Sequence, residues 1–83
     1  AEYVGEYENE LLKINLTLII EGGRLYCKFF MKKAEMNYCL NDRFSGRLDN
    51  VGNIELYFDR SKNYGIDKVT AKIGFAILQF KKK

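Results

Sequence analysis

Apolar and polar residues alternate along most of this chain, with the two-residue period that is typical of half-buried β-strands. The alternation is cleanest over residues 13–20, whose apolar face holds Leu12, Ile14, Leu16, Leu18 and Ile20. Glu21-Gly22-Gly23 interrupts it, and the two glycines supply the positive φ angles that a tight turn needs. Alternation resumes over residues 24–31, with Leu25, Cys27, Phe29 and Met31 on one face. We therefore predict a β-hairpin centred on Gly22-Gly23.

Further segments combine this alternation with β-branched or aromatic residues and are bounded by glycine, asparagine or aspartate. They are residues 3–7, 35–41, 43–48, 54–59, 66–73 and 75–81. Their connections are too short for the crossover helix that parallel pairing requires. Residues 32–36 contain good helix formers, and we expect a turn there. The predicted fold class is all-β, a small antiparallel up-and-down (meander) barrel of about eight short strands, because closure removes exposed edges.

Length and composition narrow the possible functions. With 83 residues, 47% of them hydrophobic, the chain is long enough for a single domain over residues 1–83 but too short for two. It has no histidine and few serines, which removes the usual general base, the usual zinc ligand and most hydroxyl nucleophiles. We expect no enzymatic activity, no cofactor and no metal. The longest apolar run, residues 16–20 with an interruption at Thr17, is far below the roughly 20 residues of a membrane helix, so we expect no membrane span.

The net charge gives little support for a nucleic-acid partner. It is +3, and the lysines at positions 81–83 account for an equal amount. The rest of the domain is close to neutral, whereas duplex-binding domains carry larger basic stripes because phosphate neutralisation supplies much of their affinity. The first residue, Ala1, fits either a cleaved signal peptide or a domain of a longer protein. The localisation therefore stays open between these two.

The two cysteines flank the predicted turn, and a disulfide is one interpretation for a small secreted domain. Alignment of the apolar faces of the two strands places Met31 opposite Met36, Phe29 opposite Tyr38 and Cys27 opposite Leu40. Cys39 then points to the other face. The alternative register pairs Cys27 with Cys39 but sets buried against polar side chains. We favour two free thiols, with Cys27 in the core.

A set of short motifs resembles a known family. They are Tyr3-Val4-Gly5-Glu6-Tyr7, Gly23-Arg24-Leu25, Phe44, Phe58-Asp59-Arg60 and Gly65-Ile66-Asp67-Lys68-Val69-Thr70. Their order resembles the lipocalin-like domain at the C-terminus of serine β-lactamase-like peptidases. The catalytic serine and lysine of that family belong to the separate peptidase domain, so no catalytic residue carries over. The resemblance implies an accessory barrel that packs on a partner domain, regulates access to it, or binds an apolar ligand.

A second resemblance is to small periplasmic lysozyme inhibitors, in which a serine-glycine pair precedes a strand that ends in an aromatic residue. Here Ser45-Gly46 is followed by Gly52 and Tyr57. The tryptophan-lysine-glycine sequence expected next is absent and the cysteines are placed differently. An enzyme inhibitor is therefore an alternative function.

The first binding hypothesis is a small apolar ligand inside the barrel. The inward residues would include Leu16, Leu18, Phe29, Tyr38, Leu56 and Phe58. The competing interpretation is that these side chains fill the core, because the interior of an eight-stranded barrel is just wide enough for them. With strands this short, we favour a packed interior.

The second hypothesis is protein–protein contact through the outer surface, and it is the function we favour. The parity that buries Cys27 leaves Tyr26 and Phe30 outside, and Tyr57 lies outward beside Glu55. The last strand is apolar on both faces, because Phe75 and Ile77 oppose Leu78 and Phe80. The candidate partner-binding residues are therefore Tyr26, Phe30, Tyr57, Phe75 and Ile77. We expect a docked module on a protein partner or a homodimer.

The third hypothesis is single-stranded nucleic-acid binding. The outward side of one predicted strand reads Arg24, Tyr26, Lys28, Phe30 and Lys32. Alternating charges and rings are typical of stacking platforms on small barrels. The near-neutral body and the acidic Glu55, Asp59 and Asp67 in other strands weigh against it, so it is an alternative.

Overall fold

The computed structural model describes residues 2–63 and 65–83, and these residues form one closed barrel of eight β-strands. The strands are β1 (Gly5–Asn9), β2 (Ile14–Glu21), β3 (Arg24–Phe29), β4 (Lys32–Tyr38), β5 (Arg43–Leu48), β6 (Gly52–Arg60), β7 (Ile66–Ile73) and β8 (Ala76–Lys82). Each strand pairs antiparallel with the next, and β8 returns to β1 through Tyr7–Lys82 and Glu8–Lys81. The predicted antiparallel up-and-down barrel is confirmed.

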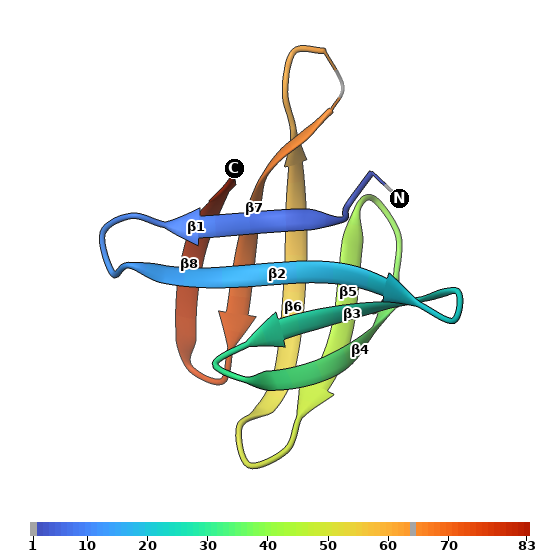
Figure 1. Cartoon of the computed structure of the whole chain (residues 1–83), viewed down its shortest axis with the longest axis vertical. Helices are drawn as coiled ribbons and strands as arrows, with labels where there is room; N and C mark the ends of the chain where they lie inside the picture. The colour runs from blue at the N-terminus through green and yellow to red at the C-terminus, as the bar shows by residue number, and fades with distance from the viewer. Residues whose placement is uncertain (1, 64) are drawn as a thin grey trace.

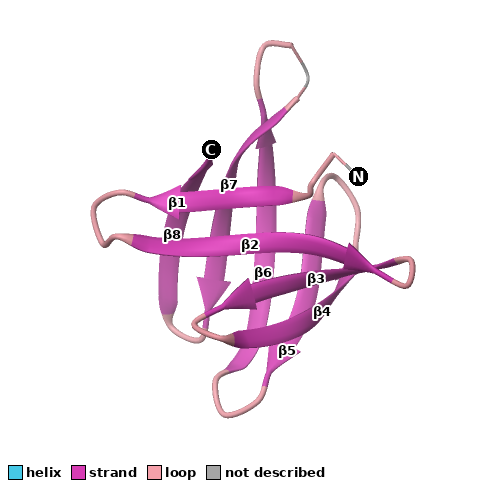
Figure 2. Ribbon diagram, in the orientation of Figure 1, coloured by secondary structure: helices cyan, strands magenta, loops and turns pink. Residues whose placement is uncertain are grey.

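The barrel is flattened, with extents of 37 × 32 × 20 Å. Strands β1 to β4 lie across β5 to β8 at a steep angle (Figure 1). Short loops join the strands, as Figure 2 shows. The pairing of β4 with β5 is short and runs only from Met36–Gly46 to Tyr38–Phe44. One corner of the barrel is therefore held by a brief ladder.

Alternate side chains fill the interior. The fully buried ones include Leu16 and Leu18 from β2, Ile54 and Leu56 from β6, and Val69 from β7. No polar or charged residue is buried in the described part of the chain. A bulge between Asp59 and Arg60 shifts the β6–β7 register and lets both Ile66 and Val69 point inward. The core is a packed interior of apolar side chains, as we expected.

The turn expected at residues 32–36 is wrong, because these residues belong to β4. Ala34 and Met36 point into the core, which is a strand pattern that overrides the helix-forming composition. The turn lies instead at Phe30-Met31, and both residues have positive φ angles, 51° and 63°. Met31, expected inside, is consequently fully exposed.

The hairpin register therefore also differs from our expectation. Cys27 lies opposite Ala34 rather than Leu40, and Leu25 lies opposite Met36. Both cysteines are free. Cys27 is buried, and Cys39 is exposed in the loop between β4 and β5. The preference for two free thiols agrees with this arrangement, although the register that supported it is wrong.

Inward-facing residues at the strand ends are less buried than the alternation predicts. Ile20 and Tyr38 lie at one rim of the barrel and are about half exposed. Tyr38 keeps its inward register opposite Phe44, and its ring lies edge-on to that of Phe44 at 5.3 Å. These side chains border the opening instead of filling the interior.

Candidate functional site

One end of the barrel gathers most of the exposed apolar side chains. In an up-and-down barrel every second hairpin loop opens at the same end, so the loops at residues 10–13, 30–31, 49–51 and 74–75 share one end of the barrel. They follow the left and lower margins of the view in Figure 1. Their exposed large apolar side chains, with that of the adjacent Ile77, are Leu11, Leu12, Phe30, Met31, Val51, Phe75 and Ile77. We call this surface the apolar end.

The side chains of the apolar end project into solvent. Met31 and Phe75 have relative exposures of 105% and 107%, and Leu11 reaches 90%. At the opposite rim the exposed large apolar side chains of the described residues are Ile20, Tyr38 and Leu40. Isolated exposed apolar residues are normal, but a set that occupies every loop of one end is typical of an interaction surface.

The β3–β4 turn has an unusual backbone conformation for its residues. Two-residue turns of this kind favour asparagine and glycine, because both central residues need positive φ. Phe30 and Met31 occupy these positions instead, and bulky residues with positive φ cost of order 1–3 kcal/mol each. The ring of Phe30 contacts that of Phe29 with centroids 4.4 Å apart, which offsets part of that cost. A strained turn that exposes its side chains is a feature that often accompanies function.

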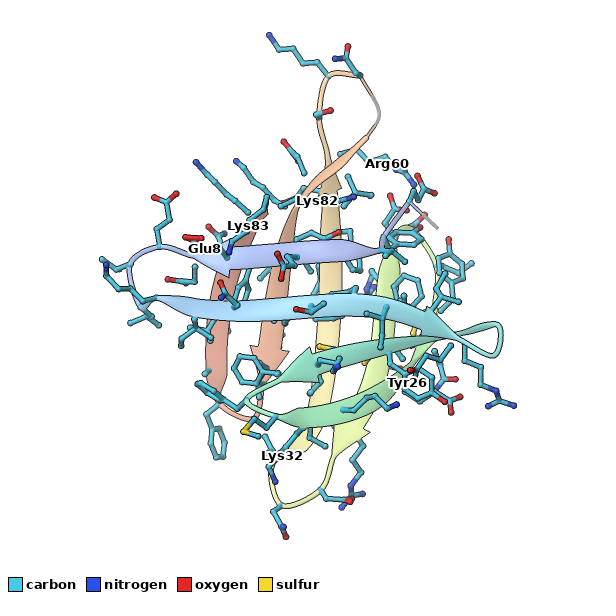
Figure 3. All side chains as sticks on the ribbon, viewed as in Figure 1. Glu8, Tyr26, Lys32, Arg60, Lys82 and Lys83 are labelled. Carbon is cyan, nitrogen blue, oxygen red and sulfur yellow. The ribbon has the colours of Figure 1, made fainter. Side chains whose placement is uncertain are left out.

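Basic residues surround the apolar end. They are Lys13, Lys28, Lys32 and Arg47, and all are exposed. We call them the basic collar. None of them forms an ion pair within residues 2–63 and 65–83. Lys32 donates to the backbone carbonyl of Asp49 at 3.2 Å, which brings its ammonium to the lower edge of the barrel (Figure 3). The carboxylates beside them include Glu10 and Asp49 in the loops and Glu8, which lines a hollow together with Glu10 and Lys13.

The structure brings together only part of the predicted partner-binding set. Phe30, Phe75 and Ile77 lie at the apolar end. Tyr26 is half-buried on the outer face of β3, where the Lys33 ammonium lies 4.7 Å from its ring centroid. Tyr57, on β6, lies among charged neighbours, with the guanidinium of Arg43 4.7 Å from its ring centroid. The two tyrosines are therefore separate from the apolar end.

Sequence reasoning missed Leu11, Leu12, Met31 and Val51, which belong to the same surface. The signal that could have found them is an apolar pair in a position where a turn is needed. Leu11-Leu12 lies between two strands in this way. An apolar turn residue has no core to enter, so its side chain stays on the surface.

The basic and aromatic row predicted for nucleic acid is broken. Strand β3 ends at Phe29, so Phe30 lies in the turn and Lys32 begins β4. Arg24 forms an ion pair with Glu35 at 2.7 Å. Beside the row, Lys33 pairs with Glu21 at 2.6 Å, and this contact lowers the pKa of the Glu21 carboxyl. Of the predicted row, Arg24, Tyr26 and Lys28 remain on one strand.

The opposite end of the barrel is bound to the segment before β1. Arg60 donates to Asp42 with both Nε and Nη2 at 2.8 Å, and to Glu2 with Nη1 at 2.7 Å. The Tyr3 hydroxyl donates to Asp42 at 2.6 Å, and its ring packs 4.8 Å from that of Phe44. The Arg60 hydrogen bonds lower the pKa of the Asp42 carboxyl, and burial together with Asp42 raises the pKa of Tyr3 to about 12.

The two termini also lie at this opposite end (Figure 1). The Lys82 ammonium donates to the carbonyl of Glu2 at 3.1 Å, and the amide of Lys83 donates to that of Glu6 at 2.9 Å. Lys83 further forms an ion pair with Glu8 at 3.5 Å, and Figure 3 shows the two side chains close together. Part of the lysine tail is therefore bound to β1.

A shallow open hollow of about 420 Å³ lies at this end as well. Apolar residues on its wall are Ile20, Leu25, Met36, Tyr38 and Phe44. It lies outside the packed interior, and Tyr3 from the bound N-terminal segment also lines it. A small apolar ligand would find this rim accessible, whereas the interior is filled.

The described residues hold no cluster of three or more histidine, cysteine, aspartate or glutamate side chains placed to hold a metal ion. Cys27 is buried, and burial raises the pKa of its thiol to about 12, so the thiol stays protonated at neutral pH. In residues 2–63 and 65–83 no helix is long and apolar enough to cross a membrane. Comparison of the sequence with protein families and with curated proteins finds no match.

Proposed function

We propose that this chain is a non-catalytic binding module that acts by docking through its apolar end. The observation that carries the proposal is that every loop at this end exposes large apolar side chains, while its core needs none of them. The strained Phe30-Met31 turn adds support, because it gives up stability to present two apolar side chains. An accessory role of this kind is also what the resemblance to the lipocalin-like domain implies.

Charge distinguishes a homodimer from docking on another protein, which are the two forms of protein contact that the sequence suggests. A homodimer that joined two apolar ends would bring two basic collars together, and like charges across an interface are costly. A docked arrangement on a different, apolar and acidic surface has no such cost. The proposal therefore favours docking on another surface over self-association.

The other candidate functions receive less support. The interior is filled by side chains, so we assign no enclosed ligand. The nucleic-acid row is interrupted and partly paired with acids. Gly46, part of the inhibitor-like Ser45-Gly46 pair, has a packing reason, because a Cβ there would lie 2.5 Å from the carbonyl oxygen of Glu35.

Site-specific photo-crosslinking tests the proposal. A photoreactive phenylalanine analogue replaces Phe75 in the expressed protein, and the matched control carries it at Leu40, which is exposed and apolar at the opposite rim. Irradiation of cells should join position 75 to the surface on which it docks, detected as an adduct by mass spectrometry, and should give no adduct at position 40. The absence of any adduct at position 75, or equal adducts from both positions, would contradict docking through the apolar end.

A further inference from the structure

The shape of the apolar end indicates what kind of surface it meets. Met31 and Phe75 are as exposed as in an extended chain, so each projects from a separate loop without neighbours that hold it. Aromatic anchors of protein interfaces generally sit in a packed patch and enter matching pockets of the partner. A fluid bilayer needs no matching pockets, because its acyl boundary accepts separate apolar side chains. The projecting loops therefore suit a lipid surface.

The basic collar favours a lipid surface that carries negative charge. Anionic lipids give a membrane a negative surface potential that attracts basic residues within about a Debye length, about 10 Å at 0.1 M salt. Lys13, Lys28 and Lys32 are exposed in or beside the apolar loops and have no ion-pair partner in the described chain. Lysine side chains lay their methylene stems along apolar surface while the ammonium stays at headgroup level.

The opposite rim shows this combination to a smaller extent. Arg24 and Arg60 are both paired with carboxylates there, and the segment before β1 covers part of the surface. Ile20, Tyr38 and Leu40 are exposed at that rim, and Arg43 and Lys62 form no ion pair there among the described residues. The Gly22-Gly23 turn of that rim carries no apolar side chain, however, whereas every loop of the apolar end does. Charge and apolar exposure therefore point to the same occupant.

We propose that the apolar end inserts its loop side chains into the headgroup boundary of a membrane that contains anionic lipids, with the basic collar on the lipid headgroups. This inference rests on the proposed function, because it names the surface on which the apolar end docks. Hydrophobic insertion fixes the orientation, with the barrel upright on the membrane and the termini away from it. The collar makes binding dependent on anionic lipid and on salt.

Co-sedimentation with vesicles tests this inference. The unmodified protein should bind phosphatidylcholine vesicles that contain phosphatidylglycerol and should bind pure phosphatidylcholine at least about tenfold more weakly. Met31→Ser combined with Phe75→Ser should reduce binding by about tenfold or more, because apolar insertion is lost. The matched control, Leu40→Ser, removes an exposed apolar side chain at the opposite rim and should bind like the unmodified protein.

Charge variants test the collar separately. Lys13→Gln and Lys28→Gln should each weaken binding to the anionic vesicles by about fivefold, and salt should weaken the binding of the unmodified protein. Lys62→Gln, in the loop at the opposite end, should have no effect. Equal effects of the three substitutions would contradict the proposed orientation.

Insertion can be observed directly because the chain contains no tryptophan. In Phe75→Trp the new indole should shift to shorter emission wavelength on anionic vesicles and be quenched by brominated lipid, whereas Leu40→Trp should show neither change. If the protein fails to bind anionic vesicles while position 75 cross-links to a protein, the lipid inference is overturned and the docking proposal stands. Failure of both experiments would overturn both.

Discussion

Gly46 is the position where a single added methyl group should test the packing of the β4–β5 corner. Its φ does not lie in the left-handed region, so the backbone conformation itself allows alanine. A Cβ there would lie 2.5 Å from the carbonyl oxygen of Glu35 and 2.7 Å from Sδ of Met36. The thioether of Met36 can move, but the Glu35 carbonyl belongs to the paired strand β4 and cannot move without opening the short ladder.

Gly46→Ala should therefore destabilise the barrel by about 1–3 kcal/mol, the usual cost of overpacking. For a domain of this size, each kcal/mol lowers Tm by about 4–8 °C. Urea unfolding followed by far-ultraviolet circular dichroism gives the change in the free energy of unfolding.

The matched control is Gly65→Ala. A Cβ at Gly65 would lie no closer than 3.9 Å to the side chain of Ser61, and φ is not in the left-handed region there either. We expect no loss of stability at this position, and a gain of up to about 1 kcal/mol from the reduced entropy of the unfolded chain. A Gly46→Ala variant that unfolds at the same urea concentration as the unmodified protein would refute the close-approach argument, as would an equal loss at Gly65.

Three further predictions follow from single features. Replacing Phe30-Met31 by Asn-Gly should raise the free energy of unfolding by about 1–2 kcal/mol, because the turn strain is relieved, and should at the same time weaken vesicle binding; unchanged stability would refute the strain. A thiol reagent should modify Cys39 in the native protein and Cys27 only after unfolding, since burial raises the pKa of Cys27 to about 12; rapid native modification of both would refute its burial. Burial also raises the pKa of Tyr7 to about 12 from 10.0, so the folded state holds the proton of Tyr7 more tightly than the unfolded chain does. The contribution of Tyr7 to stability should therefore be constant below about pH 10 and be lost between about pH 10 and pH 12. Unfolding free energies across this range should show a shallower fall in Tyr7→Phe, and an equal fall in both proteins would contradict the assignment.

The two neighbouring hairpins show why part of the fold could be predicted from sequence. The β2–β3 turn lies at Gly22-Gly23 as expected, with Glu21 opposite Arg24, because glycine marks a positive-φ turn openly. The β3–β4 turn is formed by Phe30-Met31, which are not typical turn residues. The apolar alternation therefore continues into the turn, and the predicted strand extends too far. The alternation therefore predicts the strands correctly, but it does not predict how β3 and β4 pair.

The candidate site could be predicted only in part for a related reason. Phe30, Phe75 and Ile77 were selected as outward apolar residues of strands, but Phe30 and Phe75 in fact project from loops. Their position at the same end as Leu11 comes from barrel topology, since alternate loops share an end only after all strands have paired in order. Tyr26 was selected on the same parity, yet its ring is covered by Lys33 from the neighbouring strand. The alternation along a strand gives the face on which a side chain lies, but not whether neighbouring side chains cover it.

The position of both termini, bound to each other by Lys82 and Glu2 at the rim opposite the apolar loops, has a practical consequence for handling the protein. A fluorescent reporter or an affinity tag joined to either end would emerge on the far side of the barrel and leave the loops unobstructed. Immobilisation through such a tag on a sensor chip would present every molecule with Phe75 and Met31 facing the solution. The same geometry would allow the termini to be linked and the chain to be reopened at another loop without displacing those side chains.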